Sequence, residues 1–85
     1  MLYNRRILTF LKSAECGSIT KAAEQLHLST NAAWKQISNL EEEIGVTLFR
    51  KTTHGVILTE EGEYLYQQGQ KIITICDEVI RNLHN

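Results

Sequence analysis

Apolar residues recur every three or four positions through the first half of the chain, which is the spacing of amphipathic helices. The first such segment predicts a helix over residues 4–16, and Gly17 directly after it favours a helix end. Ser18 is a candidate N-cap for a second helix over residues 19–26. The predicted inward faces of these two helices carry Ile7, Phe10, Leu11, Ala14, Ala22, Ala23 and Leu26.

A third helix is predicted over residues 30–44, after a turn at His27 and Leu28. Ser29 is its candidate N-cap, and Gly45 is its predicted end. At 100° per residue, one stripe of this helix is apolar, and the opposite side has no predicted contact with the core. The apolar stripe comprises Ala33, Ile37, Leu40 and Ile44, and the free side Asn31, Trp34, Lys35 and Ser38.

Three consecutive glutamates at positions 41–43 occupy the C-terminal half of the third helix. They predict that this half is solvated and points away from any polyanion. Only the N-terminal half is then electrostatically suited to approach a nucleic acid. A rigidly held helix with polar residues on its free side has the geometry of a helix that enters the DNA major groove.

The apolar pattern changes from helical to alternating spacing after Gly45. Residues 48–52 and 56–58 predict two short strands, joined by a turn at residues 53–55. This hairpin is too small to be a sheet in its own right. Thr59 then opens a last helix that continues to Leu83, with glutamates in its first turn, where the helix dipole favours them.

The last helix is apolar over about half of its circumference, which is wider than the stripe of an ordinary surface helix. A domain of this size offers too little surface to cover such a face, so a partner chain is the simplest cover. The predicted dimerisation residues are Leu65, Ile72, Ile73, Cys76, Val79, Ile80 and Leu83. We therefore expect a mainly α-helical unit in two parts, residues 1–59 and a dimerisation helix at residues 60–85.

The 85 residues predict one small domain, and the formal net charge of −1 does not by itself favour a nucleic acid partner. Residues 1–59 hold seven Lys and Arg against five acids, and residues 60–85 hold two against five. The resulting +2 in the first part permits DNA binding. Cys16 and Cys76 lack a C-x-x-C spacing, which predicts free thiols in a reducing cytoplasm. No apolar run approaches the ~20 residues of a membrane helix, so we expect no membrane partner.

The sequence contains no evident set of catalytic residues. There is no Ser/His/Asp or Cys/His set and no glycine loop that would cradle a phosphate. The three histidines, His27, His54 and His84, have no metal-ligand spacing. The prediction is therefore a protein that is not an enzyme, with no cofactor, no metal and no small-molecule ligand in this chain.

Five spaced motifs run through the helices and the hairpin. In chain order they are Gly17-Ser18, Ala22-Ala23-x-x-Leu26, Ser29-x-x-Ala32, Leu40-Glu41-x-x-x-Gly45-x-x-Leu48-Phe49 and Leu58-Thr59-x-x-Gly62. They resemble the N-terminal winged helix-turn-helix domain of LysR-type transcriptional regulators, and the resemblance covers residues 5–84. The segment Ser29-x-x-x-Ala33-Trp34-x-x-Ile37 also resembles the winged helix of molybdate-responsive regulators, which ranks second because their longer glycine-rich wing is missing here.

The LysR resemblance implies a homodimer held by the long last helix. It also implies that each third helix reads one half of a pseudo-palindromic operator in double-stranded DNA, while the wing touches the backbone or the minor groove. Such a bacterial regulator is expected in the cytoplasm, associated with the nucleoid. Members usually continue into a large ligand-binding domain, so this chain is either an excised DNA-binding domain or a naturally short member.

The predicted DNA-contacting residues lie at the start of the third helix and in the wing. Asn31 is the candidate for a base-edge contact, because an Asn amide can pair with adenine. Trp34 either packs on the DNA or covers the seam between the second and third helices, and both readings stay open. Phosphate contacts are expected from some of the others. The full set is Ser29, Thr30, Asn31, Trp34, Lys35, Ser38, Lys51 and His54.

Several of these positions depart from the LysR pattern. Thr30-Asn31 stands where Gln-Pro is common, and Trp34 where a serine is common. Lys51 and His54 correspond to the usual arginines of the wing. These departures, with the low positive charge, also support an alternative: a module with little or no DNA affinity that dimerises with related regulators.

Overall fold

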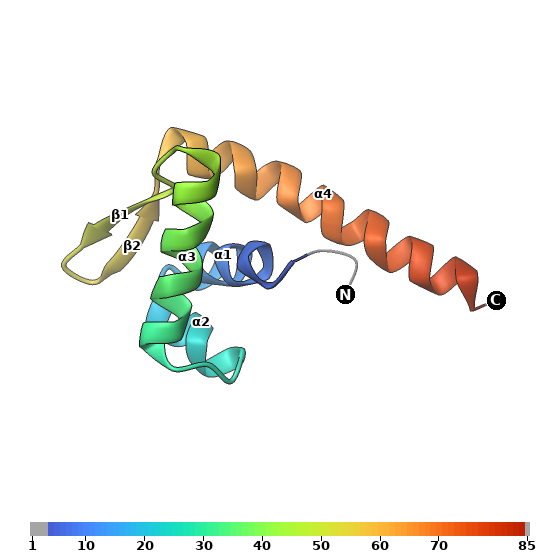
Figure 1. Cartoon of the computed structure of the whole chain (residues 1–85), viewed down its shortest axis with the longest axis horizontal. Coiled ribbons are helices and arrows are strands. Elements are labelled where there is room, and N and C mark those ends of the chain that lie inside the picture. The colour runs from blue at the N-terminus through green and yellow to red at the C-terminus, as the bar shows by residue number, and fades with distance from the viewer. Residues whose placement is uncertain (1–3, 85) are drawn as a thin grey trace.

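The structure is a computed structural model, and it describes residues 4–84 (Figure 1). Its helices are α1 (Arg5–Cys16), α2 (Ile19–Gln25), α3 (Thr30–Ile44) and α4 (Glu60–Leu83), and its strands are β1 (Phe49–Thr52) and β2 (Gly55–Leu58). All of the predicted elements are present, with ends that differ from the prediction by one residue at most. The outer bounds of the two predicted parts, residues 1 and 85, lie outside the described residues.

Each helix begins at a side chain that accepts a hydrogen bond from its own first turn, which satisfies a backbone N–H that has no partner within the helix. The predicted caps Ser18, Ser29 and Thr59 are confirmed. Asn4, which the sequence placed inside the first helix, is also a cap, and its Oδ1 accepts from the Ile7 N–H at 3.0 Å. The helix starts are therefore fixed locally, by single side chains.

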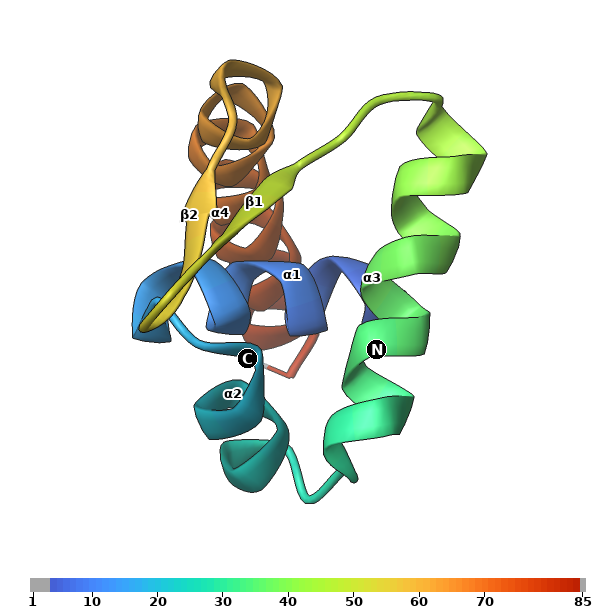
Figure 2. The same ribbon diagram turned by 90° about the vertical axis from the view of Figure 1, so that its left-hand side faces the viewer.

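The core lies where α1, α2 and α3 meet the base of the hairpin (Figure 2). The Phe10 and Phe49 rings lie 5.3 Å apart at its centre and join α1 to β1. Ile44 was predicted to belong to this core, and the prediction is wrong, because its side chain is 44% exposed. It is the last residue of α3, where the helix has already passed the body of the domain (Figure 2). The buried apolar residues are Phe10, Leu11, Ile19, Ala22, Ala23, Ala33, Ile37, Leu40, Leu48, Phe49 and Val56.

Two polar contacts hold α3 against α1. The Thr9 hydroxyl donates to the Gln36 Oε1 within the part-buried seam between the helices. Near the other end of α3, Arg6 Nη1 lies 2.7 Å from Glu43 Oε2. Both contacts come from α1, and they agree with the buried apolar stripe of α3 in the side that this helix turns to solvent.

Glu41 connects the end of α3 to the hairpin. Its Oε2 accepts from the Leu48 N–H at 2.7 Å and from the Phe49 N–H at 3.3 Å. The prediction that residues 41–43 form a solvated run is therefore wrong for Glu41, which is half-buried, whereas Glu42 is exposed. The Glu41 carboxylate tolerates partial burial because it accepts hydrogen bonds from two backbone N–H groups, which would otherwise lack a partner.

The hairpin is antiparallel, with Phe49 opposite Leu58 and Lys51 opposite Val56. It is attached to the body close to its turn, where the Val56 N–H, one pair from the end of the ladder, donates to the Gly17 carbonyl at 3.1 Å. Its far end projects away from the three-helix body (Figure 1). A two-stranded sheet has little stability alone, so this attachment decides where the hairpin points.

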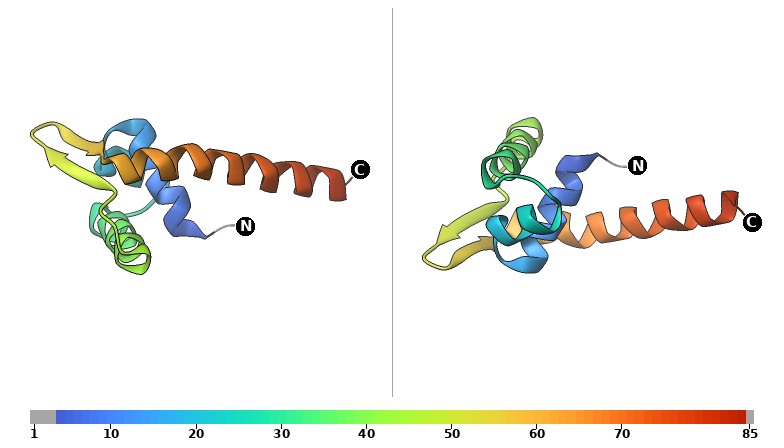
Figure 3. Two further views of the ribbon diagram at one scale, coloured as in Figure 1. Left: turned by 90° about the horizontal axis from the view of Figure 1, so that it is seen from above. Right: turned by 90° about the horizontal axis from the view of Figure 1, so that it is seen from below.

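The long helix α4 begins on the body and then extends past it (Figure 3). Leu65, Tyr66 and Ile73 pack against the core cluster, and Gly69 lies directly against the Leu11 side chain of α1. Beyond this contact the helix has only solvent around most of its circumference. The exposed large apolar residues of α4 are Tyr64, Ile72, Ile75, Val79, Ile80 and Leu83.

Candidate nucleic-acid interface

One side of α3 carries a row of exposed polar side chains. Asn31, Lys35 and Ser38 are spaced by four and three residues, so they lie on a single helix face, and all three are exposed. The face opposite is buried through Ala33, Ile37 and Leu40. The structure therefore places these three predicted site residues together, on the side of α3 that has no part in the core.

The two predicted residues at the start of α3 differ in their surroundings. The exposed Ser29 has its Oγ engaged as the N-cap, accepting from the Ala32 N–H at 3.1 Å. Thr30, the first residue of the helix, is half-buried. Ser29 thus fixes where the helix starts, and the row begins in effect at Asn31.

Trp34 lies beside this row and is half-buried, with its side chain packed against the core cluster. The Lys51 Nζ is located 4.6 Å from the centroid of the Trp34 ring. Of the two readings of Trp34 from the sequence, the packing against the body is therefore present, and the ring also contacts the hairpin. This contact joins β1 to α3, although the two residues are far apart in sequence.

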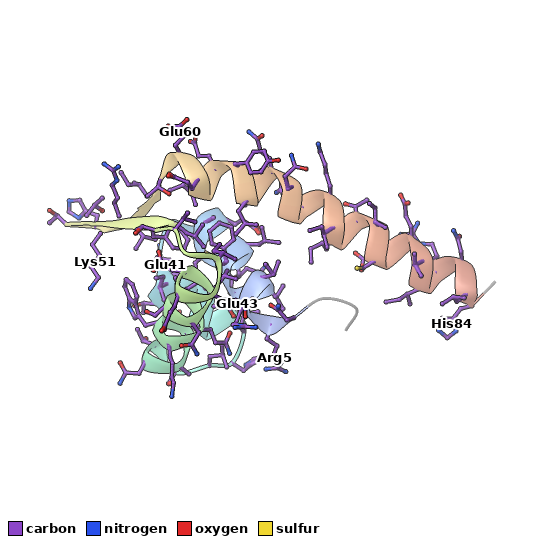
Figure 4. All side chains as sticks on the ribbon, turned by 45° about the horizontal axis from the view of Figure 1, so that its top comes forward. Arg5, Glu41, Glu43, Lys51, Glu60 and His84 are labelled. Atoms are coloured by element: carbon purple, nitrogen blue, oxygen red, sulfur yellow. The ribbon has the colours of Figure 1, made fainter. Side chains whose placement is uncertain are left out.

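The predicted residues of the hairpin separate into two places. Lys51 extends from the hairpin toward the side on which α3 lies (Figure 4). His54 lies in the turn between the strands and is exposed. Arg50 follows the buried Phe49 and therefore faces away from it. The hairpin thus presents Lys51 near α3 and His54 at its far end.

The predicted dimerisation residues also fall into two groups. Leu65 and Ile73 are half-buried against the core of their own chain, and Cys76 is half-buried. Ile72, Val79, Ile80 and Leu83 are 44%, 42%, 43% and 78% exposed. The exposed group continues along α4 beyond the body, where no part of the described chain covers it.

A hollow of about 530 Å³ lies where the end of α3 meets the start of α4. None of the elements predicted from the sequence indicated this hollow. Two residues of the sequence could have indicated it. Val46 and Tyr64 are large apolar residues on either side of the hairpin, and they belong neither to the apolar stripe of the third helix nor to the apolar face of the last helix. The hollow is lined by Ile44, Val46, Leu48, Glu60, Glu61, Tyr64 and Leu65.

A metal cluster and a membrane-spanning helix are both absent from the described residues. Within residues 4–84 no three His, Cys, Asp or Glu side chains are grouped so that they could hold a metal ion. In the same range no helix is long and apolar enough to cross a membrane. Cys16 and Cys76 are free thiols.

A short helix, a turn and a second helix whose outer side stays free, followed by a small hairpin, define a winged helix-turn-helix domain. The sequence matches the family described as "Bacterial regulatory helix-turn-helix protein, lysR family" over residues 4–63. The chain belongs to this family, which confirms the resemblance found in the sequence and leaves no need for the molybdate-responsive alternative.

Relatives and solved structures agree with this membership. The chain is 36% identical over 81 residues to the nitrogen assimilation regulatory protein nac of Escherichia coli (strain K12), which covers 95% of the chain and 27% of that protein. It is also 36% identical over 80 residues to a probable RuBisCO transcriptional regulator of Guillardia theta, covering 94% of the chain and 25% of that protein. The chain thus spans about a quarter of the length of these two relatives.

The fold is similar to that of solved DNA complexes. The crystal structure of the BenM_DBD/benA site 1 DNA complex matches with a TM-score of 0.90 and 32% identity, over 94% of this chain and 90% of that one. The crystal structure of the CbnR_DBD-DNA complex matches with a TM-score of 0.89 and 26% identity, over 94% and 92%. The match includes α4, because it extends over nearly the whole chain.

Proposed function

We propose that this chain binds double-stranded DNA sequence-specifically, as a homodimer, and thereby regulates transcription. The observation that carries the proposal is the exposed row Asn31, Lys35 and Ser38 on a helix whose opposite face is buried in the core and which contacts α1 through Gln36 and Glu43. A helix held in this way can place side chains against base edges in the major groove without further ordering. Lys51 and His54 of the wing are then the candidates for contacts beside the groove.

The similar proteins named above support both DNA binding and a role in regulation. BenM_DBD and CbnR_DBD were solved with DNA, and the relatives named above are regulators. A role in regulation rather than in catalysis is the corresponding proposal for this chain. Its proposed location, the nucleoid in the cytoplasm, follows from the proposed target.

Asn31, Lys35 and Ser38 are assigned different tasks within this proposal. Asn31, at the N-terminal end of α3, is assigned to a base edge, since its amide can donate to and accept from adenine. Lys35 and Ser38 are assigned to phosphates, which fix the register of the protein on the duplex. Thr30 is assigned to a phosphate or a thymine methyl, and Ser29 supports the row as the cap.

The proposed dimer is formed by α4 helices that run antiparallel. The exposed apolar face of α4 continues through Leu65 into the hollow beside Tyr64. An antiparallel pair centred on Ile72 would set Val79 against Leu65 of the second copy and Leu83 near the hollow of the second copy. A parallel pair would leave both hollows open. Such a two-fold pair uses the same surface on both copies and turns the two α3 helices toward one duplex.

Charge also favours the antiparallel arrangement. The first turn of α4 carries Glu60, Glu61 and Glu63, whereas its last turn carries Arg81. Antiparallel pairing brings Arg81 of one copy near the acidic first turn of the other, and it sets the two helix dipoles in opposition. Parallel pairing would bring six glutamates together at one end, since each copy contributes three.

Affinity for DNA should fall steeply with salt. If Lys35 and Lys51 of each subunit contact phosphates, the dimer neutralises about four charges, and the slope of log K against log salt is about −3.6. We expect about a hundredfold loss of affinity between 50 mM and 200 mM salt. Fluorescence anisotropy on a duplex selected from a random pool measures this slope. A flat response would contradict a DNA-docking role and, if a related regulator co-purifies, would favour the protein-interaction alternative.

Replacement of Asn31 by Ala should lower specificity more than general affinity. A bidentate contact of Asn to adenine discriminates by about 1–3 kcal/mol at each half-site. We therefore expect affinity of Asn31→Ala for the selected duplex to fall at least tenfold, while affinity for a scrambled duplex stays within about twofold. The matched control is Asn39→Ala, since Asn39 is an exposed Asn of the same helix, more than two turns from Asn31 and close to the acidic C-terminal end. Equal loss on both duplexes would show that Asn31 contacts the backbone instead.

A further inference from the structure

The contact between Trp34 and Lys51 connects the two elements that the proposed function assigns to one DNA duplex. Trp34 lies in α3 and Lys51 in β1, and the Lys51 Nζ lies 4.6 Å from the centre of the ring. This distance is inside the ~6 Å range in which an ammonium is attracted to the face of an indole. The wing and the helix are therefore coupled near the exposed row of α3.

The strand pattern explains why Lys51 reaches α3. Side chains alternate between the faces of a strand, so Lys51 shares its face with the buried Phe49, two residues earlier. Val56, directly opposite Lys51 on the other strand, is also buried. Lys51 is thus the first residue of this face that lies past the edge of the core, and it extends toward α3 (Figure 4). Arg50, on the other face, points away.

The two partners differ in how firmly they are held. The Trp34 ring has only two rotatable side-chain bonds, and its packing against the core cluster fixes it. Lys51 is exposed, and its four-carbon stem would otherwise sample many rotamers. The ring is therefore the fixed partner, and the ammonium is the one that is positioned.

We propose that Trp34 is a positioning residue, whose ring holds the Lys51 ammonium at the junction of α3 and the wing, where the backbone of bound DNA passes. An ammonium has three N–H donors. Those that do not point at the ring stay available to a phosphate oxygen, so one lysine can serve both contacts. The ordering of the stem is then achieved before binding, which favours affinity. This inference rests on the proposed function and assigns Trp34 a role through Lys51.

A double-mutant cycle on DNA affinity tests the proposal. Trp34→Leu keeps apolar bulk but removes the ring face, and Lys51→Met keeps most of the stem but removes the charge. We expect Trp34→Leu to weaken binding of the homodimer to the selected duplex by about five- to thirtyfold, because one exposed contact of this type is lost in each of the two subunits. Its salt slope should stay unchanged, because the lysine remains. In the Lys51→Met background, Trp34→Leu should have no further effect.

Arg50→Met is the matched control, since Arg50 neighbours Lys51 but faces away from Trp34. In that background the loss caused by Trp34→Leu should persist in full. Trp34→Phe, which keeps a ring face, should recover most of the affinity. An equal loss from Trp34→Leu with and without Lys51 would overturn the proposal, because Trp34 would then act through packing or through the DNA itself. No loss in either background would overturn it too.

Fluorescence of the free protein provides a readout that needs neither DNA nor a Trp34 variant. Trp34 is the single tryptophan of the chain, so its emission reports on this ring alone. Lys51→Met should change the emission of the free protein, and Arg50→Met should not. Unchanged emission in Lys51→Met would overturn the contact. Failure of the wild-type protein to bind any duplex would instead overturn the proposed function, and the emission would still report on the contact.

Discussion

Replacement of both Ile72 and Val79 by Asp should convert the proposed dimer into a folded monomer. In the single chain these side chains are 44% and 42% exposed, so a carboxylate at either position remains in water and the fold survives. In an α4 pair each substitution occurs twice, and four unpaired charges would lose solvent, which costs several kcal/mol for each ion. We expect the dissociation constant of the dimer to rise at least about a thousandfold. Analytical ultracentrifugation measures the change.

The matched control places the same charges on the other side of α4. Gln67 and Thr74 have the same spacing of seven and are exposed, and the helical rotation sets them far from Ile72 and Val79. Gln67→Asp with Thr74→Asp changes the net charge by the same amount and lowers helix propensity by at least as much, and this variant should remain a dimer. If the Ile72 and Val79 variant also sediments as a dimer, the exposed face of α4 has another partner.

Loss of the dimer should also lower the affinity for DNA. A monomer contacts one half-site, so the contacts to the second half-site no longer contribute to the same binding event. We expect the variant to bind the selected duplex with an affinity close to that for an isolated half-site. Circular dichroism should show unchanged helix content, which separates this result from unfolding.

The sequence predicted the elements because their signals are local. The caps Ser18, Ser29 and Thr59 act within one turn of their own helices, so the residue type and its position suffice to place each helix start. The exposed row of α3 was predictable for the same reason, since a 100° rotation per residue separates it from the buried stripe. Neither inference requires knowledge of what the helix packs against.

Contacts between distant segments were not predictable in this way. Glu41 appears in the sequence as part of an acidic run, and only the fold brings the Leu48 and Phe49 N–H groups to it. Ile44 follows the apolar period of α3, yet the body ends before the helix does. Trp34 and Lys51 are separated by 17 positions, so their contact depends on the path of the hairpin. Periodicity assigns a residue to a face, but it does not determine what covers that face.

Gly62 is the position where a single methyl group should disturb the most structure. A Cβ at Gly62 would lie 2.2 Å from the Leu48 carbonyl oxygen and 3.0 Å from Leu58 Cδ2. The same carbonyl accepts the Thr59 N–H at 2.9 Å, so the backbone there cannot shift freely. We expect Gly62→Ala to lower the free energy of unfolding by about 3 kcal/mol, as severe overpacking does. In a domain of this size that corresponds to a decrease in Tm of roughly 15 °C.

Gly69→Ala is the control, because Gly69 is also a buried glycine of α4. Its Cβ would lie 2.9 Å from Leu11 Cδ2, the end of a flexible side chain that can rotate away. Alanine also favours a helix interior by about 1 kcal/mol over glycine. We therefore expect Gly69→Ala to change stability by less than about 1 kcal/mol in either direction, measured by thermal and urea unfolding.

The same pair of variants relates stability to function. Gly62 contacts the start of β1 and the end of β2 through Leu48 and Leu58, so a shift at Gly62 moves the base of the wing. At a temperature where both variants are folded, Gly62→Ala should bind the selected duplex more weakly than Gly69→Ala does. Equal Tm values for the two variants would mean that the approach of α4 to Leu48 is looser than the structure shows, and the wing would then lack a fixed base.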